Sequence, residues 1–364
     1  MNPQLAVSVA AELGTPVAVV DAAVMERNLR RMADLAAAAG VKLRPHAKTH
    51  KSVGVARRQT GLGAVGLTVA TLQEAETFAA GGVDDLLLAH PPVGEVKLRR
   101  LGALAQQLKR LAVVVDDVDV ATRVPSNVEV MWEVDTGLHR IGTLPGAPSV
   151  AAVGELVRTI GAVRFRGLMT HGGHAYRAKD DAERRSAAAD EVNGLLETAD
   201  LLRRNGIEVR ELSIGSTPTV GAHPLDGITE VRPGTYVYGD GNQVTLGSQR
   251  LDDCALAVVA CVVSTPAADR AVVDAGSKAL SADLRVPGVD GFGVVVGRPD
   301  LIVARLSEEH AVLTSAGPTG LSIGNLVPII PTHVCTTVNL HRELAVVDEA
   351  GAITMQPVDA RGWR

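Results

Sequence analysis

The stretch KLRPHAKTHK, residues 42–51, decides how the first part of the chain folds. It begins with a strand candidate, Lys42–Pro45, and continues directly into a run of basic side chains. Upstream, apolar residues recur at three- and four-residue steps from Val24 to Ala39, which predicts a helix that Gly40 ends. Downstream, strand and helix patterns alternate, which is typical of βα units around a parallel sheet.

Eight strand candidates belong to this alternation. They are Lys42–Pro45, Ala64–Val69, Asp85–Ala89, Leu111–Val115, Val128–Val134, Phe165–Thr170, Glu211–Ile214 and Gly227–Arg232. Helical patterns fill most gaps, notably Leu72–Ala80, Glu95–Gln107, Val150–Ile160 and Asp181–Asn205. The last connection, Gly215 to Asp226, is loop-like. The pattern predicts a (β/α)8 TIM-type barrel over residues 24–238.

Beyond about Gly239 the pattern changes to short β-branched runs separated by Gly, Pro and Asp turns. The runs are Ala255–Ser264, Ala271–Asp274, Gly293–Val296, Leu301–Leu306, Ala311–Thr314, Val327–Ile330, Leu344–Val347 and Ala352–Gln356. Such spacing predicts a C-terminal all-β domain.

Composition excludes several classes of protein. Of 364 residues, 36 are Lys or Arg and 41 are Asp or Glu, and both signs are mixed along the chain. No long basic block is present and aromatics make up 2%, so we expect no nucleic acid and no membrane as partner. Three cysteines without paired spacing argue against a disulfide framework. Residues 1–12 lack a signal-peptide pattern and no apolar run has bilayer length, so we expect a cytoplasmic protein.

Lys48 is the chief catalytic candidate because it lies where a barrel strand ends, the location of chemistry in this fold. A lysine among other cations gives up its proton readily and can then form a Schiff base. A basic, solvated loop would explain the same residues, and spacing alone does not choose between the two interpretations.

Other polar clusters follow other strand candidates. Arg140 could donate to an anion, His174 and Tyr176 could move protons, and small donor-rich turns could bind a phosphate. Each cluster alone also fits an ordinary surface turn. The turn residues are Gly215, Ser216, Thr217, Gly234, Thr235 and Tyr236.

His333 and Cys335 lie in the β-rich part. In a strand, residues two apart point the same way, so the pair could bind one metal, and imidazole with thiolate suits Zn²⁺. A buried cysteine near a histidine is also common in an ordinary core. Cys254 and Cys261 lie in an apolar run and are expected to be core residues.

Together these clusters resemble the fold-type III pyridoxal-phosphate enzymes, in particular the D-serine dehydratase and D-threonine aldolase group, which is related to alanine racemase. The resemblance covers nearly the whole chain. The matching stretches are Thr15–Asp21, Arg44–Lys51, Asp135–Gly142, Gly173–Tyr176, Gly215–Thr219, Glu230–Gly239, Asp274–Leu280, Glu308–His310 and Pro331–Leu340.

The resemblance assigns roles to residues. Lys48 matches the Schiff-base lysine for pyridoxal 5'-phosphate, with Lys51 and Lys278 as competitors. Arg140 matches an arginine near the cofactor ring, and the donor-rich turns match the phosphate side. His174 and Tyr176 match the active-site loop. The metal pair matches His333 and Cys335, for zinc or else manganese, magnesium or cobalt. The β domain would comprise residues 1–23 and 239–364.

The resemblance implies a homodimeric lyase that acts on small D-β-hydroxy amino acids. Dehydration of D-serine, D-threonine or 3-hydroxy-D-aspartate would give a keto acid and ammonia, and Cys335 favours this route. Several aldolases of the group have a carboxylate in place of that cysteine, and aldol cleavage to glycine and an aldehyde is the alternative. Racemisation or a non-enzymatic cofactor carrier fits less well. Arg285 or Arg298 could select an acidic side chain.

Overall fold

The computed structural model describes residues 1–283 and 285–362. The chain divides into two compact units. The first, here called the β unit, comprises Met1–Arg30, Thr49–Ser52 and Thr235–Arg361. The second, the barrel unit, comprises Arg31–Lys48 and Val53–Gly234 together with Gly362. The chain therefore passes between the units several times, and neither unit is one continuous segment.

The barrel unit contains an eight-stranded parallel sheet, with strand order β2-β9-β8-β7-β6-β5-β4-β3. The N–H of Val65 donates to the carbonyl of Leu43 at 2.9 Å, and that of Ala47 donates to Thr68 at 2.8 Å. These bonds join the two end strands, so the sheet closes and the predicted barrel is confirmed. The strands are β2 (Lys42–Leu43), β3 (Leu67–Val69), β4 (Asp85–Leu88), β5 (Arg110–Val115), β6 (Glu129–Glu133), β7 (Phe165–Met169), β8 (Glu211–Ile214) and β9 (Glu230–Val231).

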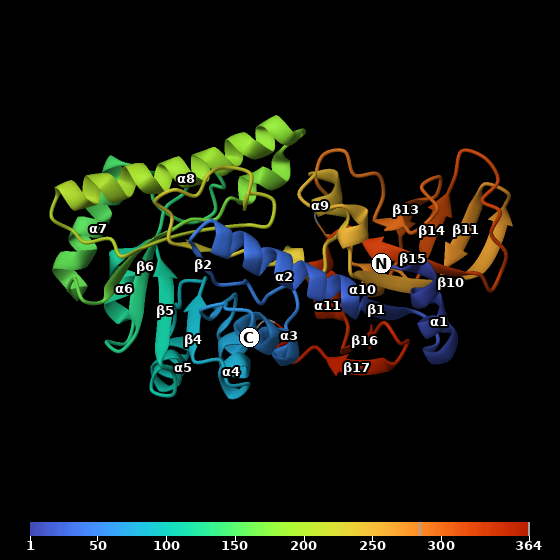
Figure 1. Ribbon diagram of the computed structural model, residues 1–364, viewed down its shortest axis with the longest axis horizontal. Coiled ribbons are helices and arrows are strands. Elements are labelled where there is room, and N and C mark those ends of the chain that lie inside the picture. Colours follow the sequence, from blue (N-terminus) through green and yellow to red (C-terminus); the bar gives the residue numbers. More distant parts are fainter. Residues whose placement is uncertain (284, 363–364) are drawn as a thin grey trace. The chain divides into compact units, whose positions relative to one another are not determined.

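Helices surround these strands (Figure 1). They are α3 (Val53–Gly61), α4 (Leu72–Ala80), α5 (Glu95–Ala105), α6 (Val118–Arg123), α7 (Ala147–Ile160) and α8 (Asp181–Arg204), and α2 (Ala22–Ala38) begins in the β unit and ends in the barrel unit. Side chains cap several of their first turns, since Thr71, Asp117 and Asp180 each accept a backbone N–H there. The connection from β8 to β9 forms turns and contains no α-helix among its residues, 215–229, as its loop-like sequence predicts.

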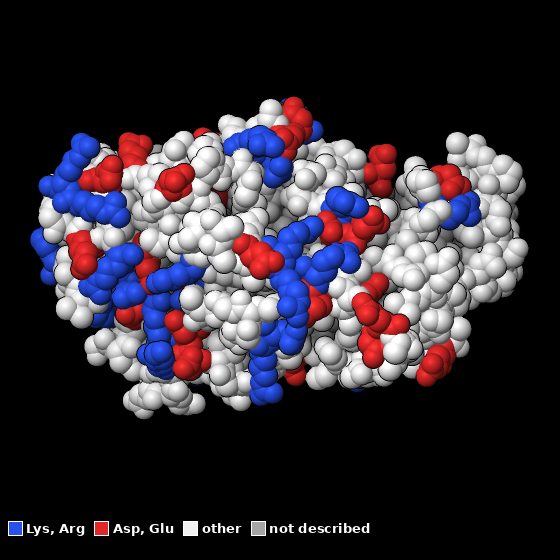
Figure 2. Space-filling view, in the orientation of Figure 1, with Lys and Arg blue, Asp and Glu red and all other residues white. Residues whose placement is uncertain are grey.

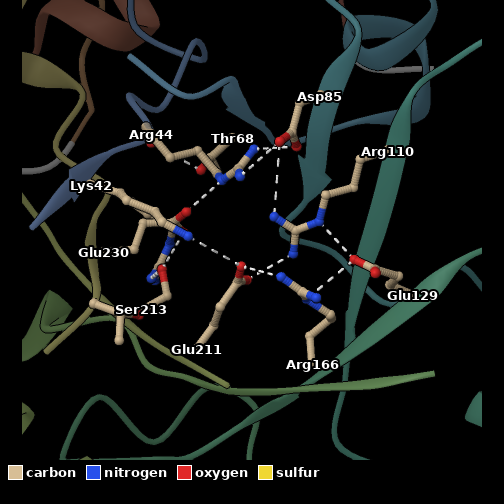
Figure 3. Close-up of polar contacts among 12 residues, drawn as sticks. Lys42, Arg44, Thr68, Asp85, Arg110, Glu129, Arg166, Glu211, Ser213 and Glu230 are labelled. Carbon is tan, nitrogen blue, oxygen red and sulfur yellow. Dashed lines mark hydrogen bonds and ion pairs between the residues drawn. The ribbon is translucent and has the colours of Figure 1, made fainter. Parts of the chain in front are cut away.

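The N-terminal end of the barrel is filled by paired charges (Figure 3). Arg44 is 2% exposed and contacts Glu230 and Asp85 at 2.7 Å each. Arg110 donates to Glu129 at 2.6 Å and to Glu211 at 2.7 Å. Lys42 and Arg166 complete the network through Glu211. Buried charges must be paired to be tolerated, so this end of the barrel is structural and the opposite end is left for chemistry.

The β unit is built on a nine-stranded sheet with order β11-β14-β13-β12-β15-β10-β1-β16-β17, and β11 also pairs with β10. The first strand, near Val17, pairs antiparallel with β10 and parallel with β16, as the resemblance implied. The strands are β1 (Val17–Asp21), β10 (Leu256–Ala267), β11 (Arg270–Val273), β12 (Gly293–Val295), β13 (Ile302–Leu306), β14 (Ala311–Thr314), β15 (Leu326–Pro331), β16 (Glu343–Val347) and β17 (Ile353–Pro357).

Short helices complete the β unit, and one 3-10 helix, η1 (Gly173–Arg177), lies in the barrel unit. Those of the β unit are α1 (Pro3–Leu13), η2 (Thr235–Val237), α9 (Gly241–Thr245), η3 (Leu251–Asp253), α10 (Ser277–Leu280) and α11 (Val334–Leu340). Cys254 is fully buried, as expected of a core residue, whereas Cys261 is half-buried.

The surface agrees with the mixed charge of the sequence. Figure 2 shows basic and acidic side chains interspersed, without one sign covering the whole face. None of the helices formed by residues 1–283 and 285–362 combines the length and the apolar character needed to cross a membrane.

Candidate active site

A cavity of about 490 Å³ opens at the C-terminal ends of the barrel strands. This volume lies within the range of small-molecule and cofactor sites. Residues that follow seven of the eight strands line it, so the closed sheet brings together side chains far apart in the sequence. The lining residues are His46, Lys48, Ala70, Ala89, His90, Pro91, Val93, Lys97, Glu133, Arg140, Ile141, Met169, His171, Gly215 and Arg232.

Lys48 reaches this cavity because the segment after β2 is held by the neighbouring strand. Ala47 is fully buried and donates its N–H to Thr68, which fixes the backbone just before the lysine. The two competing lysines lie in the β unit. Lys51 donates its ammonium to the carbonyl of Ala360 at 3.3 Å, and Lys278 forms an exposed ion pair with Glu309 at 2.7 Å. Neither is among the described residues that line this cavity, whereas Lys48 is.

Two histidines in the cavity are kept uncharged. Burial, followed by the charges of Lys48, Arg140 and Arg232, lowers the pKa of His46 and of His171 well below the ordinary value. His171 lies 2.9 Å from the carbonyl of Gly215 through Nδ1, so its Nδ1 carries the proton. These imidazoles therefore act as neutral hydrogen-bonding groups around the lysine.

Glu133, the last residue of β6, is a carboxyl group that the sequence did not single out. It is 4% exposed, and burial raises its pKa to about 8 despite the opposing effect of Arg232 and Arg140. Its Oε2 has no hydrogen-bond partner within residues 1–283 and 285–362. A buried, unpaired carboxyl in a cavity calls for a ligand that would satisfy it.

Arg232 lies on the same cavity wall and is held from below. It donates to Ser213 Oγ at 2.6 Å, and Ser213 donates in turn to Glu230 Oε1 at 2.6 Å. It also donates to the carbonyl of Thr170 at 2.5 Å. Burial lowers the pKa of Arg232, and the charges of nearby carboxylates oppose this by raising it. The guanidinium nevertheless stays cationic, because the pKa of an arginine is so high. The guanidinium is thus a fixed positive charge in the cavity wall.

Glu191 in α8 holds two of the predicted loops together. Its Oε1 accepts the N–H of Gly172 at 2.7 Å and that of Gly215 at 2.8 Å. Gly215 has φ 146°, and a Cβ there would meet the backbone N of Arg232 at 2.6 Å, so a glycine is required. The N–H of Gly215 is therefore engaged by Glu191, and any phosphate contact at this turn would have to come from the residues after it.

Among the described residues, the other predicted site residues do not line this cavity. His174 and Tyr176 lie in η1 and are half-buried, and His174 Nε2 is 4.0 Å from Asp190 Oδ2. Ser216, Thr217 and Gly234 are buried in turns of the barrel unit, whereas Thr235 and Tyr236 belong to the β unit.

The prediction that His333 and Cys335 share a strand is wrong. Strand β15 ends at Pro331, His333 is the N-cap of α11, and Cys335 lies in its first turn. The helix begins there because Asp240 Oδ2 accepts the N–H of Val334 at 3.1 Å. The side chains of His333 and Cys335 are nevertheless within hydrogen-bonding reach of each other.

The surroundings of this pair suit a metal with open positions. Burial lowers the pKa of His333, but hydrogen bonds to Asp283 and Cys335 outweigh it and raise the pKa to about 10. Asp283 Oδ2 lies 2.7 Å from His333 Nδ1, an arrangement that orients metal-binding histidines. Thr49 Oγ1 lies 3.1 Å from Cys335 Sγ. Within residues 1–283 and 285–362, no group of three or more His, Cys, Asp or Glu could hold a metal. The pair would thus supply two protein ligands.

The cavity also fits pyridoxal phosphate on its own evidence. It has the volume, a lysine for the aldehyde, the anchored guanidinium of Arg232 as a positive charge for an anionic group, and an unpaired buried carboxyl.

Comparison with known proteins agrees with this site. Residues 20–242 match the family described as alanine racemase, N-terminal domain, and residues 255–347 match the putative serine dehydratase domain. The chain is 36% identical over 356 residues to D-threo-3-hydroxyaspartate dehydratase of Delftia sp. (strain HT23), which covers 89% of this chain and 92% of that protein. It is 32% identical over 367 residues to D-threonine aldolase of Arthrobacter sp, covering 97% and 94%.

A solved structure of the Delftia sp. HT23 dehydratase superposes with a TM-score of 0.87 at 33% identity, covering 96% of this chain and 98% of that one. A mutant of the same enzyme has been solved in a metal-free form. The chain therefore belongs to the family of fold-type III enzymes that join an alanine racemase-like barrel to a serine dehydratase domain.

Proposed function

We propose that this protein is a pyridoxal-phosphate-dependent lyase that converts a D-β-hydroxy amino acid into a keto acid and ammonia. The placement of Lys48 in a cation-lined cavity at the mouth of a closed barrel carries the proposal. The dehydratase and aldolase relatives support the same class of substrate.

Lys48 would bind the aldehyde carbon of the cofactor covalently. Arg140 and Arg232 would contribute positive charge around it. Bound pyridoxal phosphate supplies an electron sink for charge that develops at the substrate Cα. The proposed phosphate-side residues are Gly215, Ser216, Thr217, Gly234, Thr235 and Tyr236. The N–H of Gly215 already donates to Glu191, so Gly215 would contribute by allowing the tight turn and not by binding the phosphate itself. His174 and Tyr176 remain the proposed active-site loop.

We assign proton transfer to Lys48: its amine, released when the substrate's amino group takes its place on the cofactor, would accept the proton from Cα. The neutral imidazoles of His46 and His171 add no further positive charge next to that amine. Glu133 is protonated below about pH 8 in the wild-type chain and can donate a hydrogen bond into the cavity.

A spectrum tests the lysine directly. The purified protein loaded with pyridoxal phosphate should absorb visible light, and borohydride should fix the cofactor to the chain. Lys48→Ala should lose both properties, while Lys278→Ala, a lysine on the surface of the β unit, should keep both. A borohydride-fixed adduct in Lys48→Ala would make the assignment wrong.

His333 and Cys335 would hold a divalent metal, and we propose zinc because imidazole and thiolate donors suit it. The metal supplies Lewis-acid chemistry for a departing hydroxyl group. Asp283 fixes the orientation of the His333 ring. Elemental analysis should find about one zinc per chain, and Cys335→Ser should lower that content. Chelation should stop turnover without bleaching the cofactor; full activity after exhaustive chelation would remove the pair from the mechanism.

Aldol cleavage is the second candidate, because the D-threonine aldolase of Arthrobacter sp is 32% identical. The His333 and Cys335 pair resembles the pattern of the dehydratases in this group, which favours dehydration. Product analysis with D-threonine separates the two: ammonia with 2-oxobutanoate indicates dehydration, and glycine with acetaldehyde indicates cleavage.

We also propose that the active form is a homodimer, which light scattering on the purified protein would test. The complete β unit weighs against a cofactor carrier made of a barrel alone. A racemase would not need the metal pair.

A further inference from the structure

A second cavity of about 300 Å³ adjoins the first in the barrel unit, and we call it the annex. Ala70, His90 and Lys97 line both cavities, so the two share a wall. The annex lies where β3 and β4 end and where α4 and α5 begin. No carboxylate is among its lining residues in the described chain. The other lining residues are Thr71, Leu72, Leu88, Pro92 and Arg100.

Lys97 is an available cation in this wall. It lies in the first turn of α5, where no side chain caps the helix and the free N–H groups add partial positive charge. The nearby carboxylates are engaged elsewhere, Glu95 with Arg99 at 3.7 Å and Glu76 with Arg100 at 2.6 Å. Within residues 1–283 and 285–362, Lys97 forms no hydrogen bond or ion pair.

His90 supplies a second donor of a different kind. Burial, followed by the charges of Lys97 and Arg140, lowers its pKa. At neutral pH its ring is therefore uncharged and offers an N–H rather than a second positive charge. A cation beside a neutral donor suits one carboxylate group.

The annex is distant in the strand order from one of the turns proposed for the phosphate. Gly215 follows β8, whereas His90 follows β4, and the order β8-β7-β6-β5-β4 places these strands four positions apart. In a closed ring of eight, that is the largest possible separation. Lys97 is thus free to bind a second anion while the phosphate occupies its own side.

We infer that the annex is a specificity site for the side-chain carboxylate of an acidic D-β-hydroxy amino acid, with Lys97 as its charged partner and His90 as its neutral donor. The inference rests on the proposed function and narrows its substrate to the dicarboxylic class, such as 3-hydroxy-D-aspartate. Neutral D-serine and D-threonine have no group that would use this charge.

D-aspartate and D-asparagine form the probe pair. They share shape, differ in one charge, and lack a β-hydroxyl, so binding is read without turnover. Each is titrated into the protein loaded with pyridoxal phosphate and zinc, and the change in visible absorption gives its Kd. We expect the wild type to bind D-aspartate about fivefold or more tightly than D-asparagine, about 1 kcal/mol for a partly exposed charge pair.

Lys97→Met should bring the two Kd values together by weakening D-aspartate alone. Arg99→Met is the matched control, because Arg99 lies in the same helix, is also exposed, and lines neither cavity. This control should keep the wild-type ratio. Lys97→Glu should reverse the preference.

The inference is overturned if the wild type binds neither probe, or binds D-aspartate no more tightly than D-asparagine. It is also overturned if Lys97→Met keeps the wild-type preference for D-aspartate, or if this variant loses affinity for pyridoxal phosphate while the ratio of the two Kd values is unchanged. Turnover is read separately. If D-aspartate is preferred through Lys97 but no D-β-hydroxy amino acid is broken down, the lyase proposal is contradicted and the anion site is retained. If neutral substrates are turned over but D-aspartate is not preferred, the anion site is contradicted and the lyase proposal is retained.

Discussion

Replacing Arg44 by methionine tests whether the charge network at the N-terminal end of the barrel stabilises the fold (Figure 3). Arg44 is 2% exposed and contacts Glu230, itself 1% exposed, at 2.7 Å. Methionine keeps much of the volume and removes the charge. Glu230 would then retain the hydroxyl of Ser213 but lose its cation.

The magnitude follows from this burial. Removing one partner of a buried ion pair costs about 3–5 kcal/mol, because the other charge stays buried and unpaired. Asp85, the second partner, is 19% exposed and can regain water, so its loss adds little. We expect the free energy of unfolding to fall by about 4 kcal/mol. Arg203→Met is the matched control: its pair with Asp200 at 3.4 Å is exposed and should be worth less than about 1 kcal/mol.

Urea unfolding at pH 7 measures both variants without cofactor. Tryptophan fluorescence, to which Trp132 in the buried part of β6 contributes, reports on the barrel unit, and circular dichroism checks the whole chain. A loss in Arg44→Met no larger than that in Arg203→Met would refute the reasoning.

Three other residues give sharp expectations. Burial raises the pKa of Glu133 to about 8, so the wild-type chain loses stability as the pH rises from about 4.5 to 8. Glu133→Gln lacks this titrating group and should therefore become more stable relative to wild type over that range. Urea unfolding midpoints at pH 5 and pH 8 measure the difference. Gly215→Ala should lower the unfolding free energy by about 1–3 kcal/mol, since φ 146° and the contact with Arg232 exclude a Cβ; a neutral result in the same titration would contradict the glycine requirement. Glu191→Gln replaces two hydrogen bonds to a carboxylate by weaker bonds to an amide, and should lower the free energy of unfolding by about 2 kcal/mol and weaken the binding of pyridoxal phosphate. An unchanged Kd for pyridoxal phosphate, measured from its absorption, would show that the two loops keep their positions without Glu191.

The barrel could be predicted because each of its strands carries a local signal. Leu111–Val115, for example, is an apolar run after a helical pattern, and the structure places β5 at Arg110–Val115. The position of Lys48 followed from the rule that strands of such barrels end at the site. The short β9 has two residues, so its predicted bounds, Gly227–Arg232, were too wide.

Other features depend on contacts that no local pattern records. Alternation does not say which face of β6 turns inward, so Glu133 was not singled out; a carboxylate within an apolar run was the available signal. Lys97 and His90 reach the cavity only because the ring brings α5 and β4 to its mouth. The helix at His333 and Cys335 was missed because its start depends on Asp240, almost a hundred residues earlier in the chain.

The pairing of β1 bears on how the chain is made. Its two neighbours, β10 and β16, begin at Leu256 and Glu343, so synthesis finishes all eight strands of the barrel sheet before either neighbour exists. Domains generally fold as they emerge from the ribosome. A nascent chain would then carry a folded barrel behind a leading strand with two unpaired edges, which is a template for aggregation. Chaperone demand during translation should therefore peak late, while the C-terminal strands are still being added.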